Sequence, residues 1–524
     1  MTPNQTTNLS MTTINPQADQ PATSTAVGSY QFQIGTITPL SPEARADVRP
    51  QIRLPGDGRL LSDFATEVAT HLTGKDIYSR NGQTVALEGG VLIRLDAQKL
   101  RTWVERHLVC YRHRRAPEQF YSVTATMRPD DAVGVLNAPQ FIERLLKIRR
   151  VNHARLPITR ANNRLELLPV GYDSASQTLT LSDIEYRLDM ECGEAVTVLD
   201  ELLAEFCFAD DARSKAVAVA GMVGLYAWQL IPAQTLRPAF IFVANAEGAG
   251  KSLLVQVIIT PTLGEFPTGC KAKNDDELRK VISTIALEGR PVLFFDNLKG
   301  KLSSPALESF LSAPVWTDRQ LGGNKTITAD NLATVFITGN GVTVSPDMRR
   351  RSLFVELHLE AERAEDRQFK QNLDLPTLLA MRPRILAALW SLVKHWDTHG
   401  RPAPSRSHSA FKPWAKIVAG IVETAGFACP LDTANVTTAI DPDASDMQAL
   451  VAEMAGKTAL SFAELVKLAR SLECFEAVIG NGAELDRRAK AKFAKLLTSY
   501  DRRLVSNHRF IIEDKGHARK YRVT

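Results

Sequence analysis

The feature that most constrains the fold is a short apolar segment that runs directly into a loop of small residues and then into a helix. The sequence AFIFVANAEGAGKSLLVQVI covers residues 239–258. We expect a strand over its first part and a helix after Lys251, because β-forming residues give way to a glycine-rich turn. Small residues let successive backbone N–H groups turn inward at the positive end of the helix dipole, an arrangement that binds phosphate groups. The residues assigned to this loop are Asn245, Ala246, Glu247, Gly248, Ala249, Gly250, Lys251 and Ser252.

The last two loop residues have the chemistry expected for a nucleoside triphosphate. We expect Lys251 to reach the β- and γ-phosphates of ATP and the Ser252 hydroxyl to ligate Mg²⁺. Asn245 stands where such loops usually have their first glycine, and asparagine tolerates a left-handed backbone better than most residues. The alternative is a chance Gly-Lys-Ser in a surface loop. The strand before it and the helix after it favour the phosphate-binding interpretation.

Two later apolar segments also end in polar residues. RPVLFFDNLKG (290–300) predicts a strand that ends at Asp296, an acid placed to hold Mg²⁺. Asn297 follows at a position where many such enzymes have a water-activating glutamate, which leaves the rate of hydrolysis open. ATVFITGN (333–340) predicts a strand that ends at Asn340, whose side chain would orient the attacking water. A capping aspartate and an ordinary Gly-Asn turn are the alternatives.

Three consecutive arginines follow the last of these strands. In SPDMRRRSLFVEL the arginines are Arg349, Arg350 and Arg351. We assign Arg350 or Arg351 as an arginine finger that reaches the γ-phosphate bound to a neighbouring subunit and stabilises transition-state charge. For any single one of them, a solvated basic turn is the alternative.

In their order and spacing these motifs resemble those of AAA+ ATPases. More narrowly, they are similar to superfamily-three and minichromosome-maintenance-like helicases of phages, plasmids and integrated mobile elements. The resemblance covers roughly residues 200–430 and includes FKPWAKIVAGIVETAGF after the core. It implies an α/β P-loop core that assembles as a ring, expected to be a hexamer, with ATP and Mg²⁺ at subunit interfaces and a single DNA strand in the channel.

The same resemblance implies two further features. A β-hairpin before the asparagine strand should project into the channel, and DRQLGGNKTITAD (318–330) has suitable tight-turn residues. Lys325 is then the expected phosphate contact, and a plain exposed hairpin is the alternative. Arg384 or Arg382 is the candidate for a second nucleotide sensor.

The basic charge of the chain is concentrated at its C-terminal end. Residues 487–524 contain twelve Lys or Arg and three acids, whereas the net charge of the whole chain is only +5. A basic amphipathic helix followed by two strands predicts a winged-helix domain that binds duplex DNA. A protein-docking winged helix is the alternative. The expected DNA contacts are Arg487, Arg488, Lys492, Lys495, Arg509, Lys515, Arg519 and Lys520.

Composition divides the 524 residues into five parts. Residues 1–30 are a polar leader that we expect to be disordered, with no apolar segment typical of a secretory signal. We expect an N-terminal α+β domain of unknown role at 31–200, the AAA+ core at 201–400, a linker and helical segment at 401–446, and the winged-helix domain at 447–524. No apolar run reaches the ~18–20 residues that span a bilayer. The six cysteines lack a CxxC spacing, and we expect reduced thiols in a bacterial or phage-infected cytoplasm.

These observations predict an ATP-dependent DNA helicase or replication initiator of a mobile genetic element. The alternative is a non-unwinding AAA+ remodeller or a DNA-bound ATPase switch, which Asn297 favours. A metabolic P-loop kinase is disfavoured, because the sequence offers no site for a small phosphate acceptor and ends in a basic segment.

Overall fold

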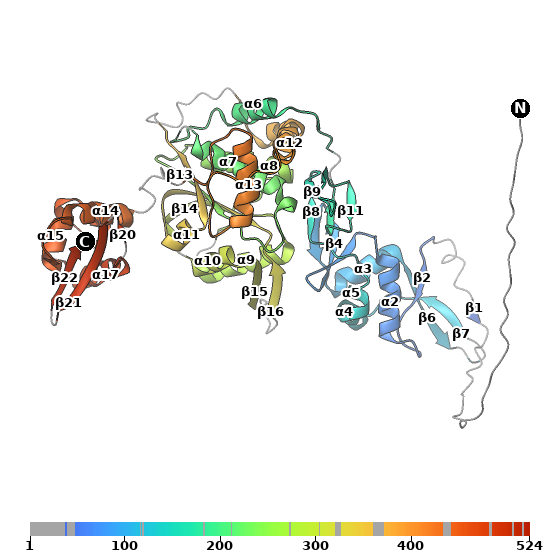
Figure 1. Cartoon of the computed structure of the whole chain (residues 1–524). Coiled ribbons are helices and arrows are strands. Elements are labelled where there is room, and N and C mark those ends of the chain that lie inside the picture. The colour runs from blue at the N-terminus through green and yellow to red at the C-terminus, as the bar shows by residue number, and fades with distance from the viewer. Residues whose placement is uncertain are drawn as a thin grey trace, which may run out of the picture.

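The structure of the chain is a computed structural model. It describes residues 37–38, 48–115, 117, 120–181, 184–210, 212–271, 274–302, 304–319, 326–359, 371–432, 442–480, 485–502, 504–505, 508–515 and 518–524. Along the chain these residues form an N-terminal α+β module, a central α/β core and a small C-terminal unit (Figure 1). The predicted leader at 1–30 lies outside the described residues.

The central core is built on a parallel four-stranded sheet. Its strands are β13 (Ala239–Ala244), β14 (Val292–Leu302), β17 (Thr334–Val344) and β18 (Ser352–Leu357). They lie in the order β14-β17-β13-β18, so β17 separates the two strands that carry the phosphate-loop sequence and Asp296. The strands are nearly continuous apolar runs because both faces of the sheet are covered. A mixed α/β fold around a parallel sheet is therefore confirmed.

Helices cover both faces of this sheet, and alternate strand residues point to each layer. One layer packs against Phe240, Phe336 and Val355, and the other against Ile241, Ile337 and Phe354. The first layer contains α6 (Cys192–Leu203), α7 (Arg213–Tyr226), α8 (Lys251–Leu263), α12 (Leu375–Thr398) and α13 (Lys412–Thr424). The second contains α9 (Asp275–Glu288) and α10 (Pro305–Ser312). The strand ends near the loop are thus held by buried packing on two sides.

The hydrophobic cores do not divide at residue 200. Helix α6 begins at Cys192 and packs on α12, and residues from Ala154 onwards join the cluster that contains the sheet. A separate cluster belongs to the N-terminal module. The module contains α2 (Leu61–Leu72), α3 (Ala97–His107), α4 (Pro129–Asn137), α5 (Pro139–Ile142) and the strands β1 (Ile37–Thr38), β2 (Gln51–Arg53), β3 (Ile77–Arg80), β4 (Gln83–Glu88), β5 (Val91–Arg94), β6 (Val109–Arg115) and β7 (Phe120–Thr124). Short strands β8 (Arg150–Asn152), β9 (Pro157–Thr159), β10 (Leu165–Leu167), β11 (Gly171–Asp173) and β12 (Thr178–Thr180) connect it to the core.

The C-terminal unit has its own core, which includes Phe493, Leu497, Phe510 and Tyr521. Leu496 is partly buried against that core. Its elements are α14 (Pro442–Met454), β19 (Leu460–Ser461), α15 (Phe462–Ser471), α16 (Glu476–Ile479), α17 (Arg487–Ser499), β20 (Leu504–Val505), β21 (His508–Lys515) and β22 (Ala518–Val523). The strands form a sheet in the order β19-β22-β21-β20.

Two further observations concern the whole described part of the chain. None of its helices combines the length and the apolar character needed to cross a membrane. All six cysteines lie in it, and each is a free thiol.

Candidate functional site

The loop between β13 and α8 has the backbone shape of an anion-binding turn. Gly250 is the N-cap of α8 and has φ +90°, a left-handed conformation that side chains other than glycine rarely adopt. Helix α8 starts at the next residue, so its first N–H groups and its positive dipole end open onto the loop. The loop can therefore stabilise a phosphate with backbone donors alone.

Lys251 adds a positive side chain to this turn. Its residue is only 8% exposed, and its Nζ donates to the Ala246 carbonyl oxygen at 3.4 Å. Burial lowers the pKa of the Lys251 ammonium, and the carboxylates of Glu247 and Asp296 oppose that shift. The ammonium therefore lies inside the loop, between its backbone and two acids.

Three side chains from three different elements meet at one carboxylate oxygen. The hydroxyls of Ser252, at the start of α8, and Thr338, on β17, both donate to Asp296 Oδ1, at 2.6 and 2.7 Å. The Asn297 N–H donates to Thr338 Oγ1 at 2.8 Å, so the same hydroxyl orients both residues at the bend in β14. We assigned no role to Thr338 from sequence, because its importance depends on β17 lying between β13 and β14.

The oxygen atoms of Ser252 and Asp296 fit a magnesium ion. Mg²⁺ prefers hard oxygen ligands and usually takes one or two carboxylates, completing its shell with water and substrate phosphates. Among the described residues, no three His, Cys, Asp or Glu side chains cluster closely enough to form an all-protein metal site. One hydroxyl and one carboxylate beside a phosphate-binding turn therefore suit a Mg²⁺ ion whose remaining ligands are water and substrate phosphates.

The structure gives Asn245 a different role from the one expected from the sequence. It is absent from the described residues with positive φ, so a left-handed backbone does not explain its presence. Instead its amide forms two hydrogen bonds to one backbone residue: Nδ2 donates to the Leu359 carbonyl at 2.9 Å, and Oδ1 accepts from the Leu359 N–H at 2.8 Å. A glycine could not make this connection between the loop and the segment after β18.

Two other predicted catalytic residues lie at the same edge of the sheet. Asn340 is paired in register with Ala244 at the end of β13, and its side chain is outside the described part. Asn297 is exposed and has φ +55°. Gly269 allows a close approach here, because a Cβ at that position would lie 2.9 Å from the Asp296 Cβ.

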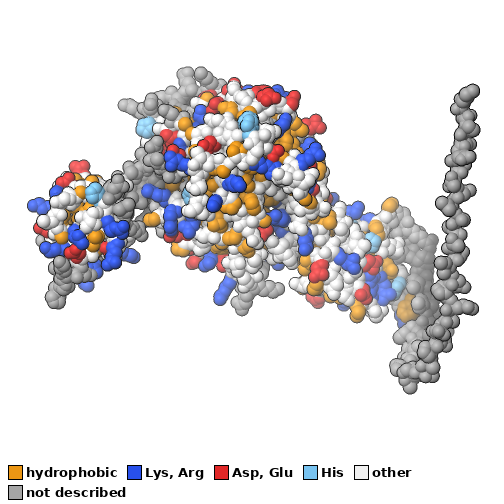
Figure 2. Space-filling view, in the orientation of Figure 1, with side chains coloured by type: hydrophobic (Ala, Val, Ile, Leu, Met, Phe, Trp, Pro, Cys, Tyr) orange, Lys and Arg blue, Asp and Glu red, His pale blue; other side chains and the backbone are white. Residues whose placement is uncertain are grey.

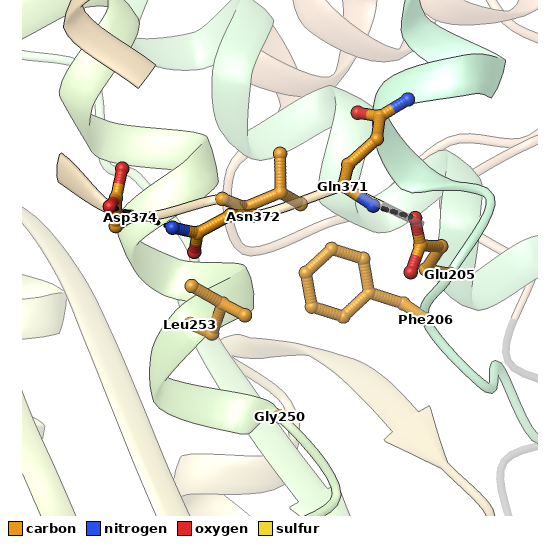
Figure 3. Close-up of a pocket in the computed structure, with 8 residues that line it drawn as sticks. Glu205, Phe206, Gly250, Leu253, Gln371, Asn372 and Asp374 are labelled. Carbon is orange, nitrogen blue, oxygen red and sulfur yellow. Dashed lines mark hydrogen bonds between the residues drawn. The ribbon is translucent and has the colours of Figure 1, made fainter. Parts of the chain in front are cut away.

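A pocket of about 350 Å³ opens beside the loop (Figure 3). In Figure 3 the side chains of Phe206 and Leu253 point into the same space, next to Gly250. The Gln371 N–H donates to Glu205 Oε1 at 2.9 Å and connects the two chain segments that form its rim. The lining residues are Glu205, Phe206, Gly250, Leu253, Gln371, Asn372, Leu373 and Asp374. Sequence reasoning missed this pocket, because its two main segments are more than 160 residues apart.

The predicted arginine fingers lie at the opposite edge of the sheet. The Ala239 N–H, at the start of β13, donates to the Arg351 carbonyl at 2.9 Å. The six residues of β13 span roughly 20 Å, so these arginines cannot reach the loop of their own subunit. Arg351 Nη1 lies 3.5 Å from an Asp347 carboxylate oxygen, and the exposed Arg350 also pairs with Asp347.

Of the two sensor candidates, Arg382 lies away from the loop. Arg382 is buried and donates to the carbonyls of Pro261 (3.0 Å) and His153 (2.6 Å), so it holds the C-terminal end of α8. Arg384 pairs with Glu201 at 2.8 Å. Arg382 therefore contacts the end of α8 that is remote from the loop, and Arg384 stays the candidate for the second nucleotide sensor.

Two regions are predicted to contact DNA: the hairpin before β17, whose turn lies outside the described residues, and the C-terminal unit, most of which is described. Strands β15 (Val315–Arg319) and β16 (Thr326–Asp330) form the two antiparallel arms of the expected hairpin, and Lys325 lies outside the described residues. In the C-terminal unit, Figure 2 shows Lys and Arg side chains gathered where α17 lies. Of the predicted DNA contacts there, Arg487, Arg488, Lys492, Lys495, Arg509, Arg519 and Lys520 are exposed, and the side chain of Lys515 is outside the described part.

The fold and the loop geometry define an α/β protein with a candidate anion site at the carboxyl edge of its sheet. Neither a protein-family model nor a curated protein matches the chain. The chain is similar to the solved apo structure of the NrS-1 C-terminal region, with 10% identity, a TM-score of 0.41, and coverage of 88% of this chain and 99% of that one. It is also similar to Cch, described as an active helicase of SCCmec type IV, with 11% identity, a TM-score of 0.29, and coverage of 77% of each chain. Because both scores are low, the function proposed below rests on the geometry of the chain itself and on the resemblance of its motifs.

Proposed function

We propose that the protein is an ATP-dependent DNA helicase or replication initiator of a mobile genetic element. The observation that carries the proposal is the shared oxygen of Asp296, which accepts hydrogen bonds from Ser252 and Thr338 beside the loop that holds Lys251. A buried ammonium, a helix N-terminus and a hydroxyl–carboxylate pair are together the groups that bind a triphosphate and its cation.

In this proposal the residues divide the work of binding and orientation. The N–H groups around Gly250 hold the phosphate oxygens, and Lys251 neutralises charge on the β- and γ-phosphates. Mg²⁺ bound by Ser252 and Asp296 would neutralise charge on the same phosphates. Thr338 keeps the carboxylate and the Asn297 backbone in position. Asn340 is the residue we propose to orient the attacking water.

The adjoining pocket suits the base of the nucleotide. Phe206 and Leu253 provide apolar walls, and Glu205, Gln371 and Asn372 add polar groups at the rim. A mostly apolar cavity with a few polar groups is typical of small-molecule sites. We therefore assign this pocket to the adenine ring.

We further propose a ring assembly, which the position of the arginines supports. Arg350 and Arg351 are roughly 20 Å from the loop of their own subunit, judged by the six residues of β13, so they can act only on a neighbour. A neighbouring subunit whose arginine edge faces the loop would complete the site. Six subunits are the expected number from the family resemblance.

We assign DNA binding to two places. The hairpin β15–β16, with Lys325 in its turn, would contact the strand in the channel. In the C-terminal unit the elements follow the order α14, β19, α15, α16, α17, β20 and the β21–β22 hairpin, which supports the proposal of a winged helix in which α17 would enter the major groove of duplex DNA. The exposed basic residues of α17 and the hairpin would contact phosphates.

The second candidate is a DNA-bound ATPase switch that does not unwind. Asn297 supports it, because the residue after Asp296 is an amide and cannot take a proton from water. The two candidates share the nucleotide site and differ in what ATP turnover drives.

The deciding experiment measures ATP turnover and strand displacement on forked duplexes with the full chain. We expect Mg²⁺-dependent hydrolysis that DNA stimulates, together with unwinding. Asp296→Asn should abolish both, and Asp276→Asn on the exposed face of α9 is the matched control. Hydrolysis without displacement on forks of either polarity would favour the switch. A wild-type chain that does not bind ATP would contradict both candidates.

A further inference from the structure

A second group of basic side chains lies where the N-terminal module meets the core. Two adjoining cavities of about 360 and 240 Å³ share Arg149 and Leu332 in their walls. The charged residues that line them, within the part of the chain that the structure describes, are Arg80, Lys147, Arg149, Arg237 and Asp330. These walls therefore carry four positive groups and one carboxylate.

The cavities are distinct from the nucleotide site. Arg237 precedes the first residue of β13, and Asp330 and Leu332 precede the first residue of β17. They thus lie at the amino edge of the sheet, whereas the phosphate loop lies at its carboxyl edge. Asp330 is also the last residue of β16, so the cavities adjoin the base of the β15–β16 hairpin, which projects from the core in Figure 1.

The arginines in these walls use few of their donors on charged partners. Arg149 Nη2 is 3.5 Å from Asp330 Oδ2, which is long for an ion pair. Arg237 Nη1 donates to the Asn331 carbonyl at 3.1 Å and the Thr235 carbonyl at 3.4 Å, and Arg80 donates to the Glu288 carbonyl at the C-terminal end of α9. Because each guanidinium has five N–H donors, these hydrogen bonds use only some of the donors of each arginine.

A fourth arginine lies behind the cavities. Arg150 is 3% exposed, its guanidinium carbon lies 4.4 Å from the centre of the Trp228 ring, and Trp228 lines the smaller cavity. The Arg150 Nε is buried and has no hydrogen-bond partner among the described residues. Within the described part of the chain no acid acts on its charge, which is affected by burial and then by Arg237 and Arg80.

Burial and neighbouring positive charges both disfavour the charged form of an arginine, and both act on Arg80 and Arg237. Burial, with a smaller contribution from Arg149, lowers the pKa of both Arg80 and Arg237 to about 10, and Asp330 opposes the shift in both, as Glu288 does for Arg80. A buried charge without a full counter-charge is costly, and a bound anion would remove most of that cost.

We propose that this cluster is a second phosphate-binding site, formed jointly by the N-terminal module and the core. Paired guanidinium groups are well suited to the oxygens of a phosphate. The phosphate could come from the backbone of a single DNA strand that leaves the hairpin, or from a free compound such as pyrophosphate. The DNA source rests on the proposed helicase function, and the free-phosphate source does not.

The test uses full-length chains that carry Lys251→Ala, so that the nucleotide loop does not compete for phosphate. Pyrophosphate binding is measured by calorimetry, and binding of a labelled oligo-dT by fluorescence anisotropy at several salt concentrations. Arg149→Gln and Arg237→Gln should each weaken binding at least about tenfold for the true ligand. For single-stranded DNA, each lost contact should also reduce the salt slope by about 0.7. Arg164→Gln, at an exposed position of the connecting strands, is the control.

Asp330→Asn distinguishes ligand binding from a purely structural role. Removing the only carboxylate in the described cavity walls should tighten phosphate binding, whereas a role in docking the two parts would predict weaker binding or no change. A response confined to pyrophosphate identifies a free ligand, and one confined to oligo-dT identifies the DNA backbone. If neither ligand responds to any of these variants, the proposal is wrong. ATP turnover, measured without Lys251→Ala, reports separately on the proposed function.

Discussion

The two edges of the parallel sheet present their positive groups in different ways. At the carboxyl edge, the loop before α8 offers backbone N–H groups, one buried ammonium and a hydroxyl–carboxylate pair. At the amino edge, the groups are arginine side chains brought from the N-terminal module, the start of β13 and the turn before β18. The backbone donors of the carboxyl edge therefore depend on chain geometry that a glycine-rich loop and a helix create locally, whereas its hydroxyl–carboxylate pair joins α8 to β14. The amino edge depends on side chains that separate parts of the chain bring together.

The largest expected effect comes from Lys251→Ala at the carboxyl edge. ATP turnover should fall to background, because the phosphates lose the one cation placed inside the loop. Steady-state turnover and binding of a fluorescent ATP analogue check this, with Lys280→Ala on the exposed face of α9 as the control. Unchanged turnover would show that the loop is not part of the nucleotide site.

A smaller loss of ATP turnover is expected from changing Arg350 or Arg351 at the amino edge, because each is expected to act on the nucleotide bound by a neighbouring subunit. Rings made only of Arg351→Ala or Arg350→Ala chains should lose roughly 10³-fold in turnover while still binding ATP. When variant and wild-type chains are mixed, activity should fall faster than the fraction of wild-type chains. Activity strictly proportional to that fraction would mean that these arginines do not complete a neighbour's site.

Thr338→Val tests the hydroxyl that connects Asp296 and Asn297. The change keeps the shape of the side chain but leaves the Asn297 N–H without its partner, so we expect about a tenfold fall in kcat. Thr338→Ser should restore most of that loss. Thr284→Val on α9, whose hydroxyl donates to the Lys280 carbonyl within its own helix at 3.0 Å, is the matched control. Equal kcat in Thr338→Val and wild type would show that the hydroxyl does not position the acid.

The smallest effect on turnover is expected from removing the C-terminal unit, which leaves both edges of the sheet intact. The cut must remove residues 442–524, because Phe493, Phe510 and Tyr521 belong to the core of that unit and a shorter deletion would expose it. Turnover without DNA should persist, whereas affinity for duplex DNA should fall, with a salt slope lower by about 0.9 for each lost contact. If the folded truncation binds duplex as tightly as the full chain, the unit docks a protein instead.

Local sequence was sufficient where neighbouring residues create the structure. The strand, turn and helix at 239–258 appear as β13, the loop and α8, because β-propensity, a left-handed glycine and a helix start are properties of adjacent residues. The hairpin arms around Gly322 and the basic helix that starts at Arg487 were predictable for the same reason.

Other features depended on the order of strands and on contacts between distant segments. Thr338 acts on Asp296 only because β17 lies between β13 and β14, and periodicity carries no information about that order. Asn245 holds Leu359, and Phe206 meets the segment at Gln371, across more than a hundred residues of chain. In the sequence, Arg150 is one of several basic residues with nothing to distinguish it. In the folded chain it is buried beside Trp228 and close to two other arginines. Burial and the pairing of charges are properties of the packed chain, so these parts of the protein were decided by its tertiary structure.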